Sequence, residues 1–446
     1  MWTLLPKEYT SEYEQKYRLF EKYPEREYIL YSNNTHHLLP RYFHINYPYD
    51  KLIIHIDKQF IAREMENVEF TSSLREHQIP IVDTFINKYI DQGYVNGLLN
   101  AYPSCGKTCI SIYLACKFKR KTLIVVDNQK LKDQFIESIV KFTNLTIDDI
   151  GFIQGSKFDS DKPITITMVQ TLLSKLKRNL KDFYIKIRDC GFDFVIYDEV
   201  HKTSAGPKYA MSTLFINSKN IIGLSATPYV RDVHALLLFN TIGDIIHTSK
   251  AYECTPNIVY VTYNSKIDQK IKNKSHYMRD YIRLQAFYNS VIYNNMQYLE
   301  VIYKLAKKCL DRGHVTIILV STVKQIESII EYLASRDISA EPLYSKKPDV
   351  DKVNSTILVG TFKFCSTGFD FKELSALILA SPYKGKISLV QSIGRILRTS
   401  TGKKQPVVFD LMDTQFPSLF ESNITGKNKI FSDEFKGCEI RNVNMD

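Results

Sequence analysis

The segment Ala101–Thr108 (AYPSCGKT) combines residue types that bind the phosphates of a nucleotide. A phosphate-binding loop needs inward-facing backbone N–H groups, a lysine that reaches the β- and γ-phosphates, and a hydroxyl that holds Mg²⁺. Lys107 and Thr108, directly after Gly106, supply the lysine and the hydroxyl. The alternative is a chance Gly-Lys-Thr at the start of a helix. The segment predicts a nucleotide site, with ATP and Mg²⁺ as its ligands.

Two adjacent carboxylates, Asp198 and Glu199, directly follow the apolar run Phe194–Tyr197. At the end of a buried strand, the first carboxylate can hold Mg²⁺ and the second can activate the water that attacks a γ-phosphate. Taken alone, the acids could merely end an edge strand. Because they follow a phosphate loop along the chain, they favour an ATPase.

Small hydroxyl residues follow a third apolar run, Ile221–Leu224. The hydroxyls of Ser225 and Thr227 could hydrogen-bond the acidic pair and pass the state of the nucleotide to neighbouring loops. A turn without any such role is the alternative. We interpret the segment as a coupling element beside the acids.

Two arginines three residues apart, Arg395 and Arg398, share one face of an expected helix. They could stabilise charge on a γ-phosphate held by another domain, as arginine fingers do. A solvated basic face is the usual alternative for this spacing. The nearby Gln391 and Gly394 favour the catalytic interpretation.

Short apolar strands alternate with helices around these motifs, a pattern typical of an α/β fold with a parallel sheet. The pattern occurs twice, so two such domains in tandem are predicted. The expected strands are 97–100, 122–126, 164–168, 194–197, 221–224, 316–320, 356–359, 376–379 and 407–409. The expected helices are 79–89, 108–118, 131–142, 323–334 and a long one, with breaks, over 277–312.

Three domains are expected from changes in this pattern. Residues 1–70 are rich in Tyr, Pro and His, and they predict a small α+β N-terminal domain with a strand at 51–56. Residues 71–248 are expected to form the ATP-binding domain, and residues 249–446 the second α/β domain. The length of 446 residues agrees, since domains average roughly 150 residues.

Composition excludes several classes of protein. A hydrophobic fraction of 44% with 24% charged residues is ordinary for a globular chain and excludes a disordered one. No apolar run approaches the ~20 residues of a membrane span, and the first residues lack the apolar stretch of a signal peptide. The 8 cysteines form no Cys-x-x-Cys pair, so neither a zinc site nor a disulfide framework is predicted. We therefore expect an intracellular protein without a membrane partner.

The charge balance favours a polyanionic partner. Lys and Arg number 59 against 48 Asp and Glu, a net charge of +11, which fits nucleic acid, although many intracellular proteins are basic without binding any. Basic residues of the N-terminal domain could contact duplex DNA or form a solvated surface. They are Lys7, Lys16, Arg18, Lys22, Arg26 and Arg41.

These motifs occur in the order found in superfamily 2 helicases of the DExH group, which the chain resembles over roughly residues 70–415. Ala101–Thr108 resembles motif I, Asp198–His201 the DExH box, Ser225–Thr227 motif III, and Gln391–Arg398 motif VI. The resemblance implies two tandem RecA-like domains with ATP in the cleft between them. The departures are Ser104, where many relatives have glycine, and Cys105, where serine or threonine is usual.

The resemblance also implies roles for individual residues. The residues implied to bind the nucleotide are Arg75, Gln78, Asp370 and the loop residues Ser104, Cys105, Gly106, Lys107 and Thr108. Among them, Gln78 is implied to contact the adenine base. Mg²⁺ falls to Thr108 and Asp198, and catalysis to Lys107, Asp198, Glu199, Gln391, Arg395 and Arg398. Coupling falls to His201, Ser225 and Thr227. Nucleic-acid contacts fall to Gln134, Thr171, Ser321 and Thr361.

Within the superfamily, the segments 198–205 and 223–232 are most similar to a DNA-directed branch. That branch contains UvsW-type phage helicases, XPB repair helicases and poxvirus transcript-release helicases. The resemblance implies a viral ATP-dependent DNA helicase or translocase, moving 3′ to 5′ in the host cytoplasm, virion or nucleus. Its further partners would be RNA polymerase or replication and repair proteins. The alternatives are an RNA helicase and a weak-ATPase nucleic-acid clamp in a transcription or repair assembly.

Overall fold

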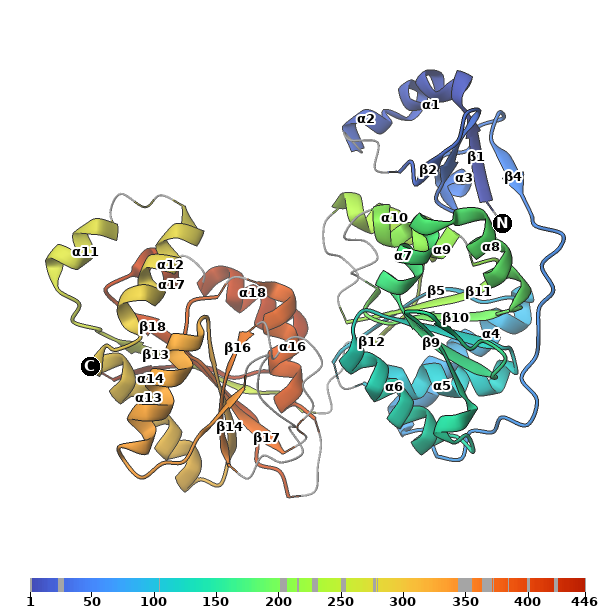
Figure 1. The fold of residues 1–446 in the computed structure, drawn as a ribbon. Coiled ribbons are helices and arrows are strands. Elements are labelled where there is room, and N and C mark those ends of the chain that lie inside the picture. Colours follow the sequence, from blue (N-terminus) through green and yellow to red (C-terminus); the bar gives the residue numbers. More distant parts are fainter. Residues whose placement is uncertain are drawn as a thin grey trace. The chain divides into compact units, whose positions relative to one another are not determined.

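The chain forms two compact units, Met1–Ser249 and Lys250–Asp446, in a computed structural model. Each unit is built round its own parallel β-sheet (Figure 1). The structure describes residues 2–22, 28–103, 105–200, 207–214, 216–226, 232–249, 254–275, 278, 280–343, 355–362, 371, 373–383, 385–398, 402–420 and 424–445.

The sheet of the first unit has eight strands, in the order β12-β5-β11-β10-β6-β9-β7-β8. All neighbouring strands are parallel except β7 and β8. The strands are β5 (Asn96–Ala101), β6 (Thr122–Val126), β7 (Ile150–Gln154), β8 (Lys157–Phe158), β9 (Ile164–Met168), β10 (Phe194–Tyr197), β11 (Asn220–Ser225) and β12 (Ile245–Ser249). The predicted strands of this domain are confirmed.

Helices cover both faces of this sheet (Figure 1). On one face lie α4 (Ile79–Gln92), α5 (Lys107–Phe118) and α6 (Gln129–Phe142). On the other lie α7 (Val169–Arg178), α8 (Leu180–Asp189), α9 (Pro207–Leu214) and α10 (Asp232–Thr241). Because helices cover both faces, the central strands β6, β10 and β11 are buried along their whole length, as in other parallel sheets.

The sheet of the second unit has seven strands, in the order β15-β16-β14-β17-β18-β13-β19, and every neighbouring pair is parallel. The strands are β13 (Asn257–Tyr263), β14 (Val315–Val320), β15 (Glu341–Leu343), β16 (Ile357–Thr361), β17 (Leu374–Leu379), β18 (Val407–Asp413) and β19 (Ile440–Asn444). The helices are α11 (Gln269–Ser275), α12 (Tyr281–Ile292), α13 (Met296–Asp311), α14 (Val323–Ala334), α16 (Lys386–Ile396), α17 (Pro417–Phe420) and α18 (Ile424–Glu434).

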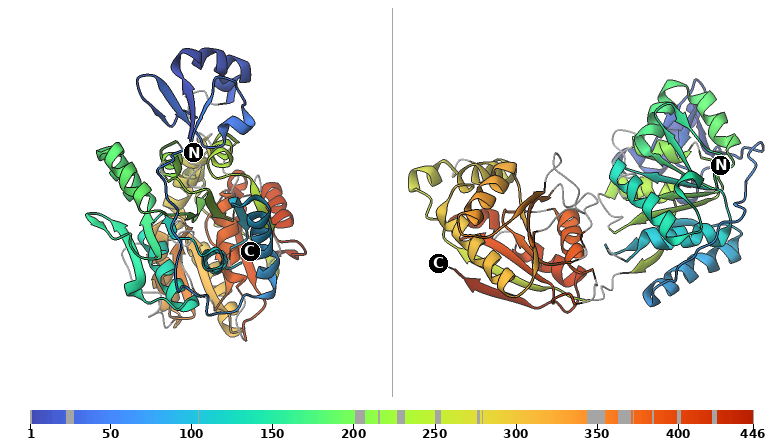
Figure 2. Two further views of the ribbon diagram at one scale, coloured as in Figure 1. Left: turned by 90° about the vertical axis from the view of Figure 1, so that its right-hand side faces the viewer. Right: turned by 60° about the horizontal axis from the view of Figure 1, so that its bottom comes forward.

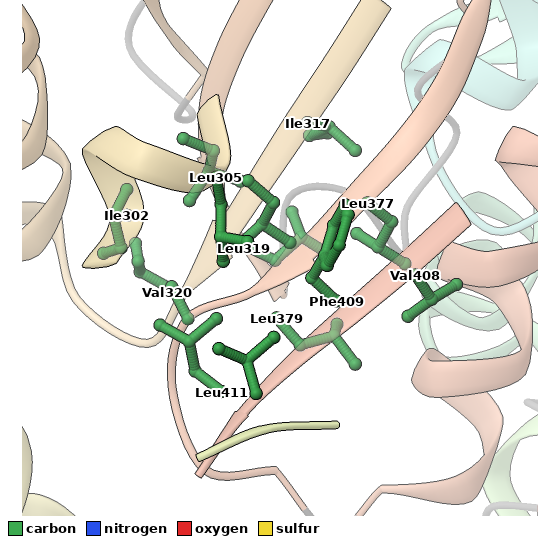
Figure 3. Packing of buried hydrophobic residues seen from close by; sticks show 14 of the residues in the cluster. Ile302, Leu305, Ile317, Leu319, Val320, Leu377, Leu379, Val408, Phe409 and Leu411 are labelled. Carbon is green, nitrogen blue, oxygen red and sulfur yellow. The ribbon is translucent and has the colours of Figure 1, made fainter. Parts of the chain in front are cut away.

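The core of the second unit lies between this sheet and its helices. Ile302 and Leu305 of α13 pack on aliphatic side chains of β14, β17 and β18, among them Leu319, Leu379 and Leu411 (Figure 3). All five side chains are almost fully buried. The core therefore holds the carboxyl ends of the central strands in a common register.

The N-terminal module, residues 1–70, is part of the first unit (Figure 2). Its antiparallel sheet has the order β2-β3-β1-β4. Its elements are β1 (Trp2–Pro6), α1 (Thr10–Tyr17), α2 (Leu19–Lys22), β2 (Tyr31–Ser32), β3 (His36–Leu39), α3 (Phe43–Asn46) and β4 (Ile53–His55). The predicted α/β architecture, two RecA-like domains with a small α+β domain at the N-terminus, is therefore confirmed.

A buried arginine attaches this module to the rest of the unit. Arg41 is 1% exposed, and its guanidinium donates to the carbonyls of Ser218, Ile216 and Thr213, the last at 3.0 Å. A guanidinium bound in this way cannot reach a DNA backbone. The suggestion that Arg41 belongs to a DNA-binding surface is therefore wrong, because its charge faces backbone carbonyls inside the protein.

Candidate nucleotide and nucleic-acid sites

The carboxyl ends of three neighbouring strands bring the motifs of the first unit together. β11 lies between β5 and β10, and the register pairs Asn100 with Ser225 and Tyr197 with Gly223. The phosphate loop follows β5, and Asp198 follows β10 directly. The loop, the acids and Ser225 therefore share one edge of the sheet, the edge at which open parallel sheets bind ligands.

The phosphate loop turns into α5 at Gly106, whose φ of +83° is in the left-handed region that favours glycine. Lys107 begins the helix, and its Nζ donates to the carbonyls of Ala101 at 3.0 Å and Tyr102 at 3.2 Å. The ammonium thus lies over the loop. The first-turn N–H groups of α5 point toward the same place, which suits an anion.

Gln78 packs directly against this loop. It is 2% exposed, its Nε2 donates to the carbonyl of Cys105 at 3.0 Å, and its Oε1 accepts from the backbone N–H of Arg75 at 3.0 Å. A side chain at Gly106 would overlap Nε2 of Gln78. In this structure the Gln78 amide holds the loop, and its contact with adenine stays a prediction.

The acidic pair has an unusual backbone. Asp198 continues β10, with its N–H donating to the carbonyl of Val125 at 3.0 Å. Glu199 has a φ of +46°, which is uncommon for a residue with a side chain. The next residue, Val200, is fully buried over Gly223. Packing of Val200 therefore holds Glu199 in a strained conformation, as is frequent at functional sites.

Three further predicted residues of this unit lie in elements that end at, or follow, the carboxyl ends of strands in this sheet. Ser225 is fully buried at the end of β11. Gln134 lies on α6, which follows β6, and Thr171 lies on α7, which follows β9. Both side chains are partly exposed, and their contact with nucleic acid stays a prediction.

In the second unit, α16 and the residues just beyond it carry the arginine motif. Gln391 is buried, and Arg395 and Arg398 are partly exposed. Burial lowers the pKa of Arg398 to about 10, so its guanidinium remains charged at neutral pH. Burial, with a smaller effect of the Arg398 charge, lowers the pKa of Lys403 to about 8. The Lys403 ammonium donates to the Arg398 carbonyl, so two cations lie in one segment.

Ser321 and Thr361, predicted from different motifs, line one cavity of about 850 Å³ in the second unit. They follow β14 and end β16, which are neighbouring strands. Other predicted residues, Ser104, His201, Thr227 and Asp370, lie outside the described residues.

Two features of these sites were not predicted from the sequence. One is the packing of Val200 on Gly223, for which the sequence has no local signal. The other is α12, which contributes to the cavity but was predicted only as part of one long helix. Asp280 and Asn295, whose side chains cap α12 and α13, are the signal that could have separated the two helices.

The chain is similar to known helicases in sequence and fold. Residues 71–230 match the family described as "Type III restriction enzyme, res subunit". A "Putative ATP-dependent RNA helicase L396" of Acanthamoeba polyphaga mimivirus is 29% identical over 443 residues, 94% of this chain and 78% of the relative. The "ATP-dependent DNA helicase uvsW" of Enterobacteria phage T4 is 25% identical over 72% of this chain and 66% of its own length.

A further relative and a solved structure extend the comparison. The "Transcript termination protein A18" of Yaba-like disease virus is 23% identical over 86% of this chain and 76% of its own length. The structure of S. cerevisiae Dbp5 bound to RNA and ADP BeF3 matches with a TM-score of 0.55 at 12% identity, over 84% of this chain and 95% of Dbp5. The chain is therefore similar, over most of its length, to superfamily 2 helicases, which are nucleic-acid-dependent ATPases, and the relatives it matches include UvsW and A18.

Proposed function

We propose that this helicase acts on DNA, moves 3′ to 5′, and remodels branched DNA or transcription complexes. The register of β5, β11 and β10 carries the proposal, because it places the phosphate loop, the acidic pair and Ser225 at one edge of the sheet. Relatives described as a DNA helicase and a transcript termination protein support DNA and transcription. The polarity is the one implied by resemblance to this branch.

Each side chain of the first unit has a defined part in this proposal. Lys107 binds the β- and γ-phosphates, and Glu199 orients and deprotonates the attacking water. The Thr108 hydroxyl and the Asp198 carboxylate are oxygen ligands of the kind Mg²⁺ prefers. They would hold that ion, which would offset charge on the phosphates. Gln78 keeps the loop in shape through the Cys105 carbonyl and contacts adenine.

The second unit completes hydrolysis and grips the strand in this proposal. Arg395 and Arg398 stabilise charge on the γ-phosphate as the transition state forms, and Gln391 and Asp370 are the other residues of this unit assigned to the nucleotide. His201, Ser225 and Thr227 couple the nucleotide to the strand, which Gln134, Thr171, Ser321 and Thr361 contact. Such contacts to phosphates make binding depend on salt. Viral relatives support a location in the host cell or virion, with RNA polymerase or repair proteins as partners.

The deciding experiment measures ATP hydrolysis with single-stranded, duplex and branched DNA and with RNA, beside Lys107→Ala. Stimulation chiefly by DNA, lost in the variant, is the expected result. Unwinding of forks that carry only a 3′ or only a 5′ single-stranded tail then tests the polarity. Equal unwinding of both forks contradicts the 3′ to 5′ assignment.

An RNA helicase is the second candidate, favoured by the description of the mimivirus relative as an RNA helicase. Stronger stimulation by RNA than by any DNA would establish it. A weak-ATPase clamp is the third, and the unusual Ser104 and Cys105 of the loop favour it. Tight nucleic-acid binding without hydrolysis, unchanged in Lys107→Ala, would identify a clamp.

A further inference from the structure

Strand β4 (Ile53–His55) lies at the margin of the N-terminal sheet, and no strand of the described residues pairs with its outer edge (Figure 1). Its inner edge pairs with β1, where Thr3 lies opposite Ile54. The outer edge of such a strand carries backbone N–H and C=O groups that can pair with a further strand. The N-terminal sheet can therefore be extended beyond β4.

Other edge strands of the first unit have features that prevent such pairing. Strands β2 and β8 contain only two residues each, and the register of β12 shifts between Ile245 and His247. Short edge strands and bulges are devices by which proteins avoid pairing of their edges. Strand β4 has a regular register with β1 and lies in residues 52–56 (LIIHI), which include no lysine, proline or carboxylate. Its edge is therefore open to a partner strand.

The side chains of this short run are exposed although most of them are apolar. Ile53, Ile54 and Ile56 are 45%, 41% and 58% exposed. Single exposed apolar residues are normal on a protein surface. Three of them along one edge strand form a patch of the kind that marks an interaction site. A second strand paired with β4 would cover these side chains and the polar groups of the backbone together.

The sequence around β4 is complementary to itself when it is read in the opposite direction. Residues at equal distances from Ile54, on its two sides, match apolar with apolar and acid with base. The matching residues are Leu52 with Ile56, Ile53 with His55, Lys51 with Asp57, and Asp50 with Lys58. Antiparallel pairing places such residues directly opposite each other, where opposite charges and apolar pairs stabilise the sheet. A second copy of this segment therefore fits the first in both apolar character and charge.

The outermost charges of this segment are accessible in a single chain. Asp50 and Lys51 form an ion pair of 3.4 Å, with 73% and 48% of their side chains exposed, and Lys58 is exposed as well. An exposed pair contributes little, so exchanging it for pairs with a second copy costs little. The Asp57 carboxylate already accepts from the Tyr184 hydroxyl. Asp50 and Lys58 are therefore the charges to vary in a test.

We propose that two copies of this chain associate through β4, antiparallel about a two-fold axis at Ile54. The pairing joins two four-stranded sheets into one. A two-fold interface uses the same surface of both copies, which the self-complementary segment provides. Residues 50–58 are fewer than the roughly 20–30 residues on each side of a standard interface. The dimer is therefore weak and reversible, with a dissociation constant in the micromolar range, and it does not depend on the proposed substrate.

Sedimentation equilibrium of the full chain, without nucleic acid, measures this association. We expect the mass of the wild-type protein to rise across the micromolar range from that of one chain toward that of two. A mass of one chain at every concentration would overturn the inference. So would growth beyond two chains, because a two-fold contact leaves no β4 edge for a third copy.

Ile54→Lys and Ile54→Glu test the position of the axis. Each places two like charges directly opposite each other, so each should weaken the dimer about tenfold or more. An equal mixture of the two variants should associate again, because the introduced charges are then opposite in sign. Ile61→Lys is the matched control, since Ile61 is 75% exposed and lies outside the paired segment; it should associate as the wild-type protein does.

A charge reversal tests the register without changing β4 itself. Lys58→Asp sets two acids opposite each other at both ends of the pairing and should weaken the dimer several-fold, more so at low salt. Adding Asp50→Lys should restore the wild-type association. Wild-type association of Ile54→Lys would show that β4 is not the contact. No recovery in the mixture or in the double variant would contradict antiparallel pairing about Ile54.

Discussion

At the scale of single residues, the backbone conformation of Glu199 is linked to Gly223 through the packing of Val200. The left-handed backbone of Glu199 is tolerated because the next side chain, Val200, is buried over a glycine. A Cβ at position 223 would lie 2.6 Å from Leu98 Cδ2 and 3.0 Å from Val200 Cγ2. The position of the proposed catalytic carboxylate of Glu199 thus depends on a glycine, which has no Cβ, at position 223 of the neighbouring strand β11.

We therefore expect Gly223→Ala to lower kcat for ATP hydrolysis about tenfold or more and to destabilise the first unit by about 1–3 kcal/mol, the usual cost of overpacking. KM for ATP should change less, because the phosphate loop is not displaced. Gly426→Ala is the control, since a Cβ there meets nothing within 4 Å. Wild-type kcat in Gly223→Ala would contradict the dependence of Glu199 on this packing.

Lys403 gives a prediction about pH. Its pKa in the folded protein, about 8, lies below the ordinary 10.5. Between these values the unfolded chain binds a proton that the folded chain does not, so stability rises with pH there and falls as pH decreases toward 8. Lys403→Met should raise the free energy of unfolding at pH 7 and flatten its pH dependence between 8 and 10. Urea unfolding at several pH values measures both, with the exposed Lys404→Met as control; equal slopes in all three proteins would refute the assignment.

At the scale of elements, α18 is attached to the second sheet by a buried ion pair. Lys427 Nζ lies 2.6 Å from Asp410 Oδ2 of β18, and the two side chains are 7% and 1% exposed. Removing one partner would leave the other charge buried and unpaired. The same helix also carries Glu434, which pairs with Lys386 of α16 at 2.9 Å, but the Lys386 side chain is 50% exposed.

These two ion pairs predict different costs for the same kind of change. Lys427→Met should destabilise the second unit by about 3–5 kcal/mol, and adding Asp410→Leu should recover most of that loss. Lys386→Met should cost no more than about 1 kcal/mol, because water screens an exposed pair. Urea unfolding curves of the four proteins make the comparison. A similar cost for Lys386→Met and Lys427→Met would show that burial of the pair is not what matters.

At the scale of the whole molecule, the N-terminal module and the first α/β domain form one unit. The Arg41 guanidinium crosses between them, and the Tyr42 N–H donates to the Asn240 carbonyl at 2.7 Å. Further along, the Arg63 N–H donates to the Gly191 carbonyl at 3.0 Å. Backbone contacts of this kind predict that the module and the domain unfold together.

Arg41→Met tests this linkage. It leaves three buried carbonyls without their donor, so we expect a loss of about 3 kcal/mol or more and a lower Tm for the whole first unit in one transition. Lys58→Met is the control on the same module, because Lys58 is exposed. Calorimetry that showed a separate early transition of residues 1–70 would contradict a single cooperative unit.

Among the described residues, no helix combines the length and the apolar composition that crossing a membrane requires.

The sequence by itself determined the motifs and the strands that carry them. The strands at 122–126, 164–168 and 194–197 have the predicted bounds, because buried parallel strands are short runs of apolar and β-branched residues. The order of loop, acids and hydroxyls along the chain was enough to place them at one sheet edge, since the carboxyl ends of parallel strands meet there. The resemblance to superfamily 2 helicases followed from the same residues.

Only the tertiary structure decided which side chains face inward and which contacts and cavities form between segments that are far apart in the sequence. β13 and β19 were not predicted, since their side chains alternate or are exposed and they pair with strands far along the chain. Arg41 looked like a surface cation and is buried, because its partners are carbonyls with no sequence signature. The cavity lined by Ser321 and Thr361 likewise depends on segments brought together by the sheet. Local sequence encodes periodicity and caps, whereas contacts between distant segments depend on how the elements pack.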